Sequence, residues 1–187
     1  MEKKWKGKDW FSISAPDWLG SIKIGETPAT DSKSVPGRVL EVAVSDLTND
    51  QSKYYMRLGL KMDKPVGKSV LTKFHSFFCL NEYVMRMARK GLGKVPVFED
   101  VETKDGWKLQ VSVVAVLNRH GNSEIKRSVR DFASKLIKSK AKELSHQEFV
   151  KAAMAGVFQM KIKKGASKIY PVRFCEITKI ETLKSGE

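Results

Sequence analysis

The sequence predicts one α+β domain in which a curved or barrel-like antiparallel β-sheet has helices packed alongside it. Up to residue 117, apolar and polar residues alternate in short runs separated by turn-forming residues, as is typical of half-buried strands. Helical spacing of apolar residues begins only after residue 122, so the helices fall mainly in the C-terminal third. We expect a basic N-terminal arm at residues 1–8, the single domain at 9–183 and a short tail at 184–187.

The first expected elements are a basic arm, a strand and a surface loop. The arm has almost no apolar residue to bury, so we expect it to become ordered only on a partner. Its cations are Lys3, Lys4, Lys6 and Lys8. A strand from Trp10 to Ser14 ends at Ala15-Pro16, and the segment from Thr27 to Pro36, rich in Pro, Ser, Thr and Asp, indicates a loop.

The middle of the chain predicts antiparallel pairs of strands. Leu40, Val42 and Val44 alternate with Glu41 and Ala43, and a polar turn at 46–50 separates them from a second alternating run at 54–61. Strand character continues at 73–80, where a short helix follows, capped by Asn81 and ended by Gly91 or Gly93. A tight hairpin signal at 104–106 joins expected strands at 95–102 and 107–117.

Two amphipathic helices and a last strand complete the expected domain. The first helix begins at Asn122 or Ser123, and the second begins at a capping box formed by Ser145 and Glu148. The buried stripe of the first consists of Ile125, Val129, Phe132 and Leu136. The second should run through Phe149 and Met160 to a stop at Gly165, after which residues 170–183 return to the sheet.

The net charge of +14 needs a partner to explain it. Self-repulsion opposes a compact fold, and a polyanion that releases counterions on binding is the commonest compensation. A membrane surface is the less favoured partner, because the N-terminus has neither an apolar segment nor a myristoylation glycine and the longest apolar run, 111–117, is too short to span a bilayer. We therefore expect a cytoplasmic protein that binds nucleic acid and no membrane.

The basic charge is concentrated on the first C-terminal helix. From 119 to 142 the chain has eight basic residues and two acids, whereas an ordinary solvated helix mixes the two signs. We interpret one arc of this helix as a phosphate-binding face rather than a merely soluble one. Its residues are Arg127, Arg130, Lys135, Lys138 and Lys142, with Arg119 and Lys126 beside them. A second cluster, Lys163 and Lys164, lies at the end of the next helix, where cations also suit the helix dipole.

Catalytic and metal chemistry have little support in this sequence. Cys79 and Cys175 lie far apart, and their spacing with the three histidines matches no zinc site. Glu99 and Asp100 belong to an acidic group that a metal-dependent nuclease would need, but they flank a hairpin turn, where solvated acids are common. We expect no enzymatic activity, no metal and no cofactor.

Several segments in order along the chain resemble the S3Ae family of small-subunit ribosomal proteins, which archaea and eukaryotes share. The first is Lys8-Asp9-Trp10-Phe11, ending in Ala15-Pro16. It is followed by Gly37-Arg38-Val39-Leu40-Glu41-Val42, Asp46-Leu47-Thr48-Asn49-Asp50, Gly67-Lys68, Leu71-Thr72-Lys73-Phe74-His75, Thr103-Lys104-Asp105-Gly106-Trp107 and Ile169-Tyr170-Pro171-Val172-Arg173. The long basic extensions of eukaryotic members are absent, which suggests an archaeal-sized member.

The resemblance implies a structural protein of the small (30S) subunit, on the platform near the messenger RNA exit region. Its implied partners are small-subunit ribosomal RNA, neighbouring ribosomal proteins and messenger RNA. The resemblance adds Arg38, Lys73 and His75 as candidate RNA contacts. The last strand carries Phe174, Cys175 and Glu176 where family members should be more basic, so we do not expect RNA contact there. The alternative function is a non-ribosomal RNA-binding or RNA-chaperone protein with the same domain.

Overall fold

The computed structural model describes residues 7–186, and the arm residues Lys3, Lys4 and Lys6 lie outside them. Within the described range there are eight β-strands and five α-helices, and the three main helices follow residue 122. The strand pairings are antiparallel except for one parallel pair, β1 with β5, among those whose direction is established. This confirms the α+β class and the position of the helices. The chain forms two compact units, Met1–His75 and Ser76–Glu187, each with its own core.

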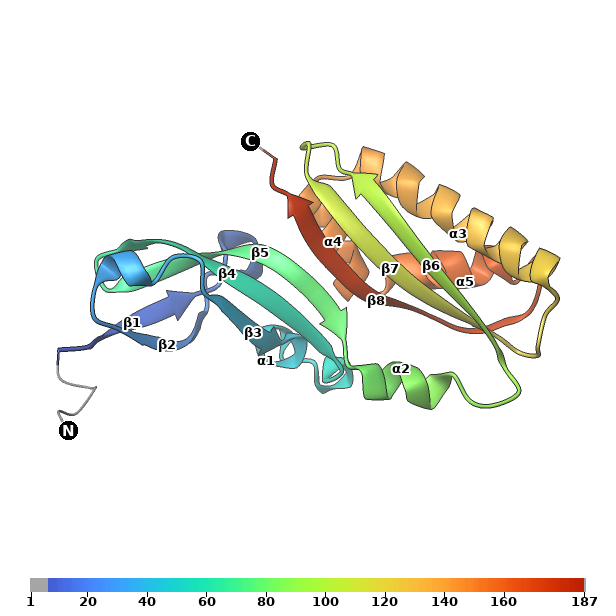
Figure 1. Cartoon of the computed structure of the whole chain (residues 1–187), viewed down its shortest axis with the longest axis horizontal. Coiled ribbons are helices and arrows are strands. Elements are labelled where there is room, and N and C mark those ends of the chain that lie inside the picture. Colours follow the sequence, from blue (N-terminus) through green and yellow to red (C-terminus); the bar gives the residue numbers. More distant parts are fainter. Residues whose placement is uncertain (1–6, 187) are drawn as a thin grey trace. The chain divides into compact units, whose positions relative to one another are not determined.

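The first unit is a strongly curved sheet (Figure 1). Its strands are β1 (Asp9–Ser14), β2 (Lys23–Ala29), β3 (Val39–Ala43), β4 (Met56–Val66) and most of β5 (Ser69–Cys79). They pair in the order β2-β1-β5-β4-β3, so β2 and β3 are the edges. Both edges line one cleft of about 340 Å³, so the sheet curls until its edges face each other without pairing. A cluster that includes Phe11, Ile13 and Val70 fills the interior.

Strand β2 was not predicted from the sequence. Its residues include Gly25 and Pro28, which disfavour strands, and the predicted loop at 27–36 begins inside it. Pairing with β1, from Asp9 opposite Ala29 to Ile13 opposite Gly25, overrides this weak local preference. Pro28 is tolerated because β2 is an edge strand, where a missing backbone N–H costs little. The remaining loop contains a short 3₁₀ turn, Ser32–Ser34.

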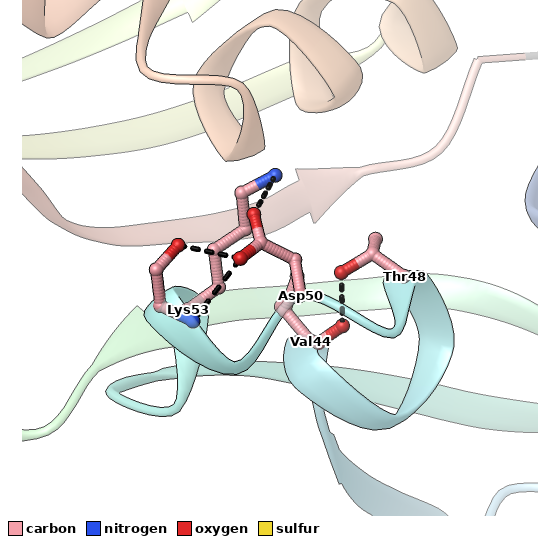
Figure 2. Close-up of polar contacts among 5 residues, drawn as sticks. Val44, Thr48, Asp50 and Lys53 are labelled. Carbon is pink, nitrogen blue, oxygen red and sulfur yellow. Dashed lines mark hydrogen bonds and ion pairs between the residues drawn. The ribbon is translucent and has the colours of Figure 1, made fainter.

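The predicted turn at 46–50 is instead a short helix, α1 (Val44–Thr48), followed by a 3₁₀ turn (Gln51–Lys53). Figure 2 shows the contacts that hold it: Thr48 Oγ1 donates to the Val44 carbonyl at 2.8 Å. The Asp50 carboxylate accepts from Ser52 Oγ at 2.6 Å and from its backbone N–H at 3.1 Å, and it pairs with Lys53 Nζ at 3.5 Å. The hydrogen bonds from Ser52 lower the pKa of Asp50. The segment 46–50, one of those that resemble the S3Ae family, therefore forms part of the connection between β3 and β4.

The second unit is an antiparallel sheet covered by helices on one face (Figure 1). The end of β5 pairs with β8 (Val172–Lys184), which pairs with β7 (Lys108–Leu117), which pairs with β6 (Gly93–Glu102). The predicted hairpin is confirmed, with Glu102 opposite Lys108 and Gly93 opposite Leu117. Helix α2 (Asn81–Met87) follows β5 and ends earlier than either predicted glycine stop.

Helices α3 (Ser123–Glu143), α4 (His146–Met154) and α5 (Val157–Ala166) form the covering layer. The capping box is confirmed: Ser145 and Glu148 exchange the two expected hydrogen bonds. The prediction of one continuous second helix was wrong, because Gly156 adopts a left-handed conformation (φ 77°) and separates α4 from α5. The buried amide of Gln159 donates to the Ala153 carbonyl at 2.9 Å, which satisfies a backbone group near this break.

Gly165 does not stop α5, because the helix continues to Ala166. It has a packing role instead. A Cβ atom at Gly165 would lie 2.1 Å from Cζ of Phe132, so only a glycine lets the Phe132 ring of α3 approach α5 this closely. The second unit is therefore held together by helix–helix packing that depends on this residue as well as by burial against the sheet.

Candidate RNA-binding surface

Helix α3 binds the sheet through a different stripe from the predicted one. Val129, Ala133, Ile137 and Ala141 are buried at a spacing of four residues, whereas Ile125, Phe132 and Leu136 are only half-buried. The predicted stripe is rotated because small alanines let the helix backbone approach β6, while Phe132 points toward α5. Of the predicted stripe, only Val129 is fully buried.

The opposite side of α3 is exposed and basic. We call the exposed residues Arg127, Lys135, Lys138 and Lys142 the α3 basic face. Asp131 and Glu124 are the acids on the exposed side of the helix. Arg130 is also exposed, but it lies on the flank beside β6, and Lys126 is half-buried. The predicted arc of cations is thus brought together on one helix, with Arg130 at its margin.

Two of the predicted cations hold α3 against the edge strand β6. Arg130 Nε donates to the Pro96 carbonyl at 3.2 Å, and Lys138 Nζ pairs with Glu99 Oε2 at 2.6 Å. Burial acts to raise the pKa of Glu99, but hydrogen bonds from Lys138 and Ser134 and the charge of Lys138 outweigh it and lower the pKa. Glu99 is therefore an ionised partner that positions the helix.

The other members of the α3 basic face have no such engagement. Within residues 7–186, Arg127, Lys135 and Lys142 form no hydrogen bond or ion pair through their side chains. Lys140, by contrast, is paired with Glu143 in the last turn. Unpaired cations on one helix face repel each other, and an external anion would relieve that repulsion.

The remaining predicted cations of the second unit lie at other places. Lys163 and Lys164 are exposed in the last turn of α5, where they also face the negative end of the helix dipole. Arg119 is exposed in the connection between β7 and α3. The structure does not bring these residues into the α3 basic face, and their contact with RNA stays a prediction.

In the first unit, the candidate contacts are partly engaged within the protein. Arg38 Nη1 donates to Thr27 Oγ1 at 2.8 Å and to the Pro28 carbonyl at 2.9 Å, so it links β2 to the start of β3. Lys73 pairs with Asp63 at 2.7 Å, and His75 is half-buried on the same strand. Lys8 is half-buried. Arg38 thus joins the two edge strands of the sheet, and an RNA contact by any of these residues stays a prediction.

The acidic group at the β6–β7 hairpin is not arranged for metal chemistry. Glu99 pairs with Lys138 of α3, and Asp100 accepts from Gln110 of β7 at 3.3 Å. Neighbouring residues of a strand point to opposite faces, so these two carboxylates cannot share one cation. Among the described residues, no cluster of three or more His, Cys, Asp or Glu side chains could hold a metal ion.

Both cysteines are free and buried in the second unit. Burial raises the pKa of the Cys175 thiol to about 12 and that of Cys79 further, so neither is a thiolate at neutral pH. Among the helices of residues 7–186, none is long and apolar enough to cross a membrane. The surface feature that stands out is the basic one.

Comparison with known proteins identifies the family of this chain. The model of the Ribosomal S3Ae family matches residues 1–186. The chain belongs to the ribosomal S3Ae family. Relatives named small ribosomal subunit protein eS1 include that of Archaeoglobus fulgidus, 36% identical, with 98% of this chain and 88% of the relative aligned. The protein of Methanopyrus kandleri is 34% identical, with 98% of this chain and 89% of the relative aligned. That of Pyrobaculum islandicum is 32% identical, with 96% of this chain and 81% of the relative aligned.

Membership of the S3Ae family confirms the resemblance seen in the sequence, and the matched relatives are archaeal. S3Ae proteins are ribosomal proteins and not enzymes, so the expectation of no catalytic activity is confirmed. The family match covers both compact units, so neither unit is an addition to the family domain.

One basic site was missed by the sequence analysis. Arg86, Arg89 and Arg173 line a cleft with Met87 and Phe174 in the second unit. Arg86 and Arg89 lie outside the helical segments that the charge analysis considered, and Arg173 lies far along the chain. A local excess of basic residues could not reveal this site, because β8 and α2 are brought together only by the fold.

Proposed function

We propose that this S3Ae-family protein is a structural component of the small ribosomal subunit in the cytoplasm and binds ribosomal RNA through the α3 basic face. The observation that carries the proposal is the row of exposed cations Arg127, Lys135 and Lys142, which have no partner among the described side chains. The relatives' names support the subunit, and the charge of +14 supports an RNA partner.

We further propose that the protein lies on the platform of the subunit, near the messenger RNA exit region; its membership of the family supports this position. In that position it would contact neighbouring small-subunit proteins, with messenger RNA close by. Helix α3 is suited to a phosphate backbone because it is rigidly fixed: a buried stripe anchors one side, and the Arg130 and Lys138 contacts with β6 set its rotation. A fixed row of cations loses little conformational freedom when it binds.

The test replaces only the cations that do not hold the helix in place. Arg127, Lys135 and Lys142 are changed to Gln, and binding to archaeal 16S ribosomal RNA is measured across a range of salt concentrations. Each phosphate contact contributes about 0.7–0.9 to the slope of log affinity against log salt, so the slope should fall by roughly 2–3. Affinity at low salt should fall accordingly.

A matched control removes three cations that are already neutralised within the protein. Lys23, Lys53 and Lys179 pair with Glu26, Asp50 and Glu181, so their change to Gln alters the net charge equally. This control should leave the slope nearly unchanged. If both variants reduce the slope alike, the α3 basic face has no special part in binding, and the proposal is wrong.

Cellular fractionation separates the ribosomal function from the alternative. A tagged chain should sediment with 30S particles in a sucrose gradient, and the α3 variant should shift toward the free fractions. If most wild-type copies sediment free of 30S particles, the protein acts outside the ribosome as an RNA-binding or chaperone-like protein.

A further inference from the structure

The arginine cleft of the second unit is a candidate site separate from the α3 basic face. It has a volume of about 220 Å³ and is lined by Arg86, Met87, Arg89, Arg173 and Phe174. Arg86 lies in the last turn of α2, Arg89 follows that helix, and Arg173 and Phe174 lie near the start of β8. The site is therefore built from two segments that are more than eighty residues apart in the sequence.

The charges of the cleft are not compensated within the described part of the chain. The three guanidinium groups are exposed, and none forms a hydrogen bond or ion pair with a residue in the range 7–186. The acid nearest in sequence to Arg173, Glu176, is buried and accepts instead from Gln159 Nε2 at 2.8 Å. Three arginines around one cleft repel each other and present planar forks that match phosphate oxygens.

The apolar lining suggests what accompanies the phosphate. Phe174 is half-buried, and Tyr83 of α2 meets its ring edge-on with centroids 5.9 Å apart, which fixes the ring orientation. A fixed aromatic ring among guanidinium groups can stack on a nucleobase, as aromatic and arginine side chains do in proteins that bind single-stranded RNA. The volume lies below the roughly 300–1,000 Å³ of pockets for drug-sized ligands, so the cleft suits one nucleotide.

We propose that the arginine cleft binds one unpaired nucleotide of RNA, with the phosphate on Arg86, Arg89 and Arg173 and the base against Phe174. This inference rests on the proposed RNA-binding function and adds a second, differently built contact to it. It also reverses the expectation that the last strand makes no RNA contact, because Arg173 and Phe174 lie near the start of that strand.

The experiment uses the full chain and two probes. The first is archaeal 16S ribosomal RNA, with affinity measured against salt for the wild type and for the variant R86Q/R89Q/R173Q. The second is a hexanucleotide, A6, titrated into the wild type while the arginine Nε–Hε signals are followed by NMR. Two matched variants accompany them: R86K/R89K/R173K keeps the charge but not the fork, and K104Q/K108Q/K184Q removes three cations near the opposite end of β8.

The expected results distinguish a built site from general attraction. The glutamine variant should lower the salt slope by about 2–3, the distant lysine variant should not, and the Arg-to-Lys variant should lose affinity while keeping most of the slope. A6 should shift the Nε–Hε signals of the three cleft arginines before others. Phe174→Leu should weaken A6 binding at least about fivefold through loss of stacking.

Other results would overturn the inference. If A6 leaves the cleft signals unchanged, or if the Arg-to-Lys variant binds like the wild type, the cleft is not a nucleotide site. If a hexaglutamate peptide shifts the same signals at equal or lower concentration, the cleft binds acidic protein instead. Failure of wild-type binding to 16S RNA, with A6 still bound in the cleft, would refute the proposed function and leave this inference standing.

Discussion

The contact between Gly165 and Phe132 gives a prediction whose sign depends on the background. A Cβ atom at residue 165 would lie 2.1, 2.5 and 3.2 Å from Cζ, Cε1 and Cε2 of Phe132, and the first two distances are closer than nonbonded carbon atoms approach. In Gly165→Ala, the ring must therefore move out of its place between α3 and α5. The cost of such overpacking is about 1–3 kcal/mol.

A second effect of the same substitution acts in the opposite direction. Alanine is favoured over glycine within a helix by up to about 1 kcal/mol, and residue 165 lies in the last turn of α5. Gly165→Ala alone should therefore destabilise the protein by about 0–2 kcal/mol. In the Phe132→Ala background the ring is gone, so the same substitution should stabilise by about 0.5–1 kcal/mol.

Urea unfolding followed by far-UV circular dichroism measures all four members of this double-mutant cycle. The coupling free energy should be about 1–3 kcal/mol, within the range for residues in direct contact. Phe132→Ala should itself cost about 2 kcal/mol, less than the loss of a fully buried phenylalanine, because the side chain is only half-buried. The variant should therefore remain folded. Equal effects of Gly165→Ala in both backgrounds would show that the ring does not pack on α5.

Two further predictions concern the same helical layer. Burial raises the pKa of Glu176 against the opposing hydrogen bonds from Gln159 and Ile177, so the stability this group contributes is complete below its unfolded pKa and is lost as the pH rises through the folded one. Glu176→Gln should therefore be more stable than the wild type at pH 8, by about 1.4 kcal/mol for each pH unit by which folding raises the pKa of Glu176, and should not be more stable at pH 4. Urea unfolding of both proteins at the two pH values measures this difference. A difference in stability that does not depend on pH would contradict the prediction. Ser145→Ala should cost about 1 kcal/mol by loss of the α4 cap, whereas the neighbouring exposed change Gln147→Ala should have little effect in the same assay.

The sequence predicted those elements whose local conformational preference agrees with their place in the fold. The hairpin of β6 and β7 and the start of α4 were found because a tight turn at 104–106 and the Ser145–Glu148 capping box are local signals. Strand β2 was missed because its residues disfavour strands, and only the pairing with β1 makes it one. The break at Gly156 was missed because a glycine within an apolar helical pattern does not reveal that its φ is positive.

The same distinction explains what the sequence could say about the candidate RNA-binding surface. Counting charges located α3, since all of its cations lie within one local segment. It could not separate Lys138, which binds Glu99 across the sheet edge, from Lys135, which has no such partner among the described residues. Both have the same local pattern, and the difference depends on which strand the helix packs against.

The arginine cleft shows why such sites require the fold. Arg86 and Arg89 are two cations at the end of a short helix, which by itself indicates only a favourable interaction with the helix dipole. Arg173 is one cation near the start of a strand whose other basic residues, Lys179 and Lys184, lie farther along it. Their proximity arises because α2 packs on β8 through Tyr83 and Phe174, and Phe174 is also the residue that would stack on a base. The contact that assembles the second unit at this point thus also forms the cleft, so a Tyr83→Ala change should reduce A6 binding in parallel with loss of α2 packing.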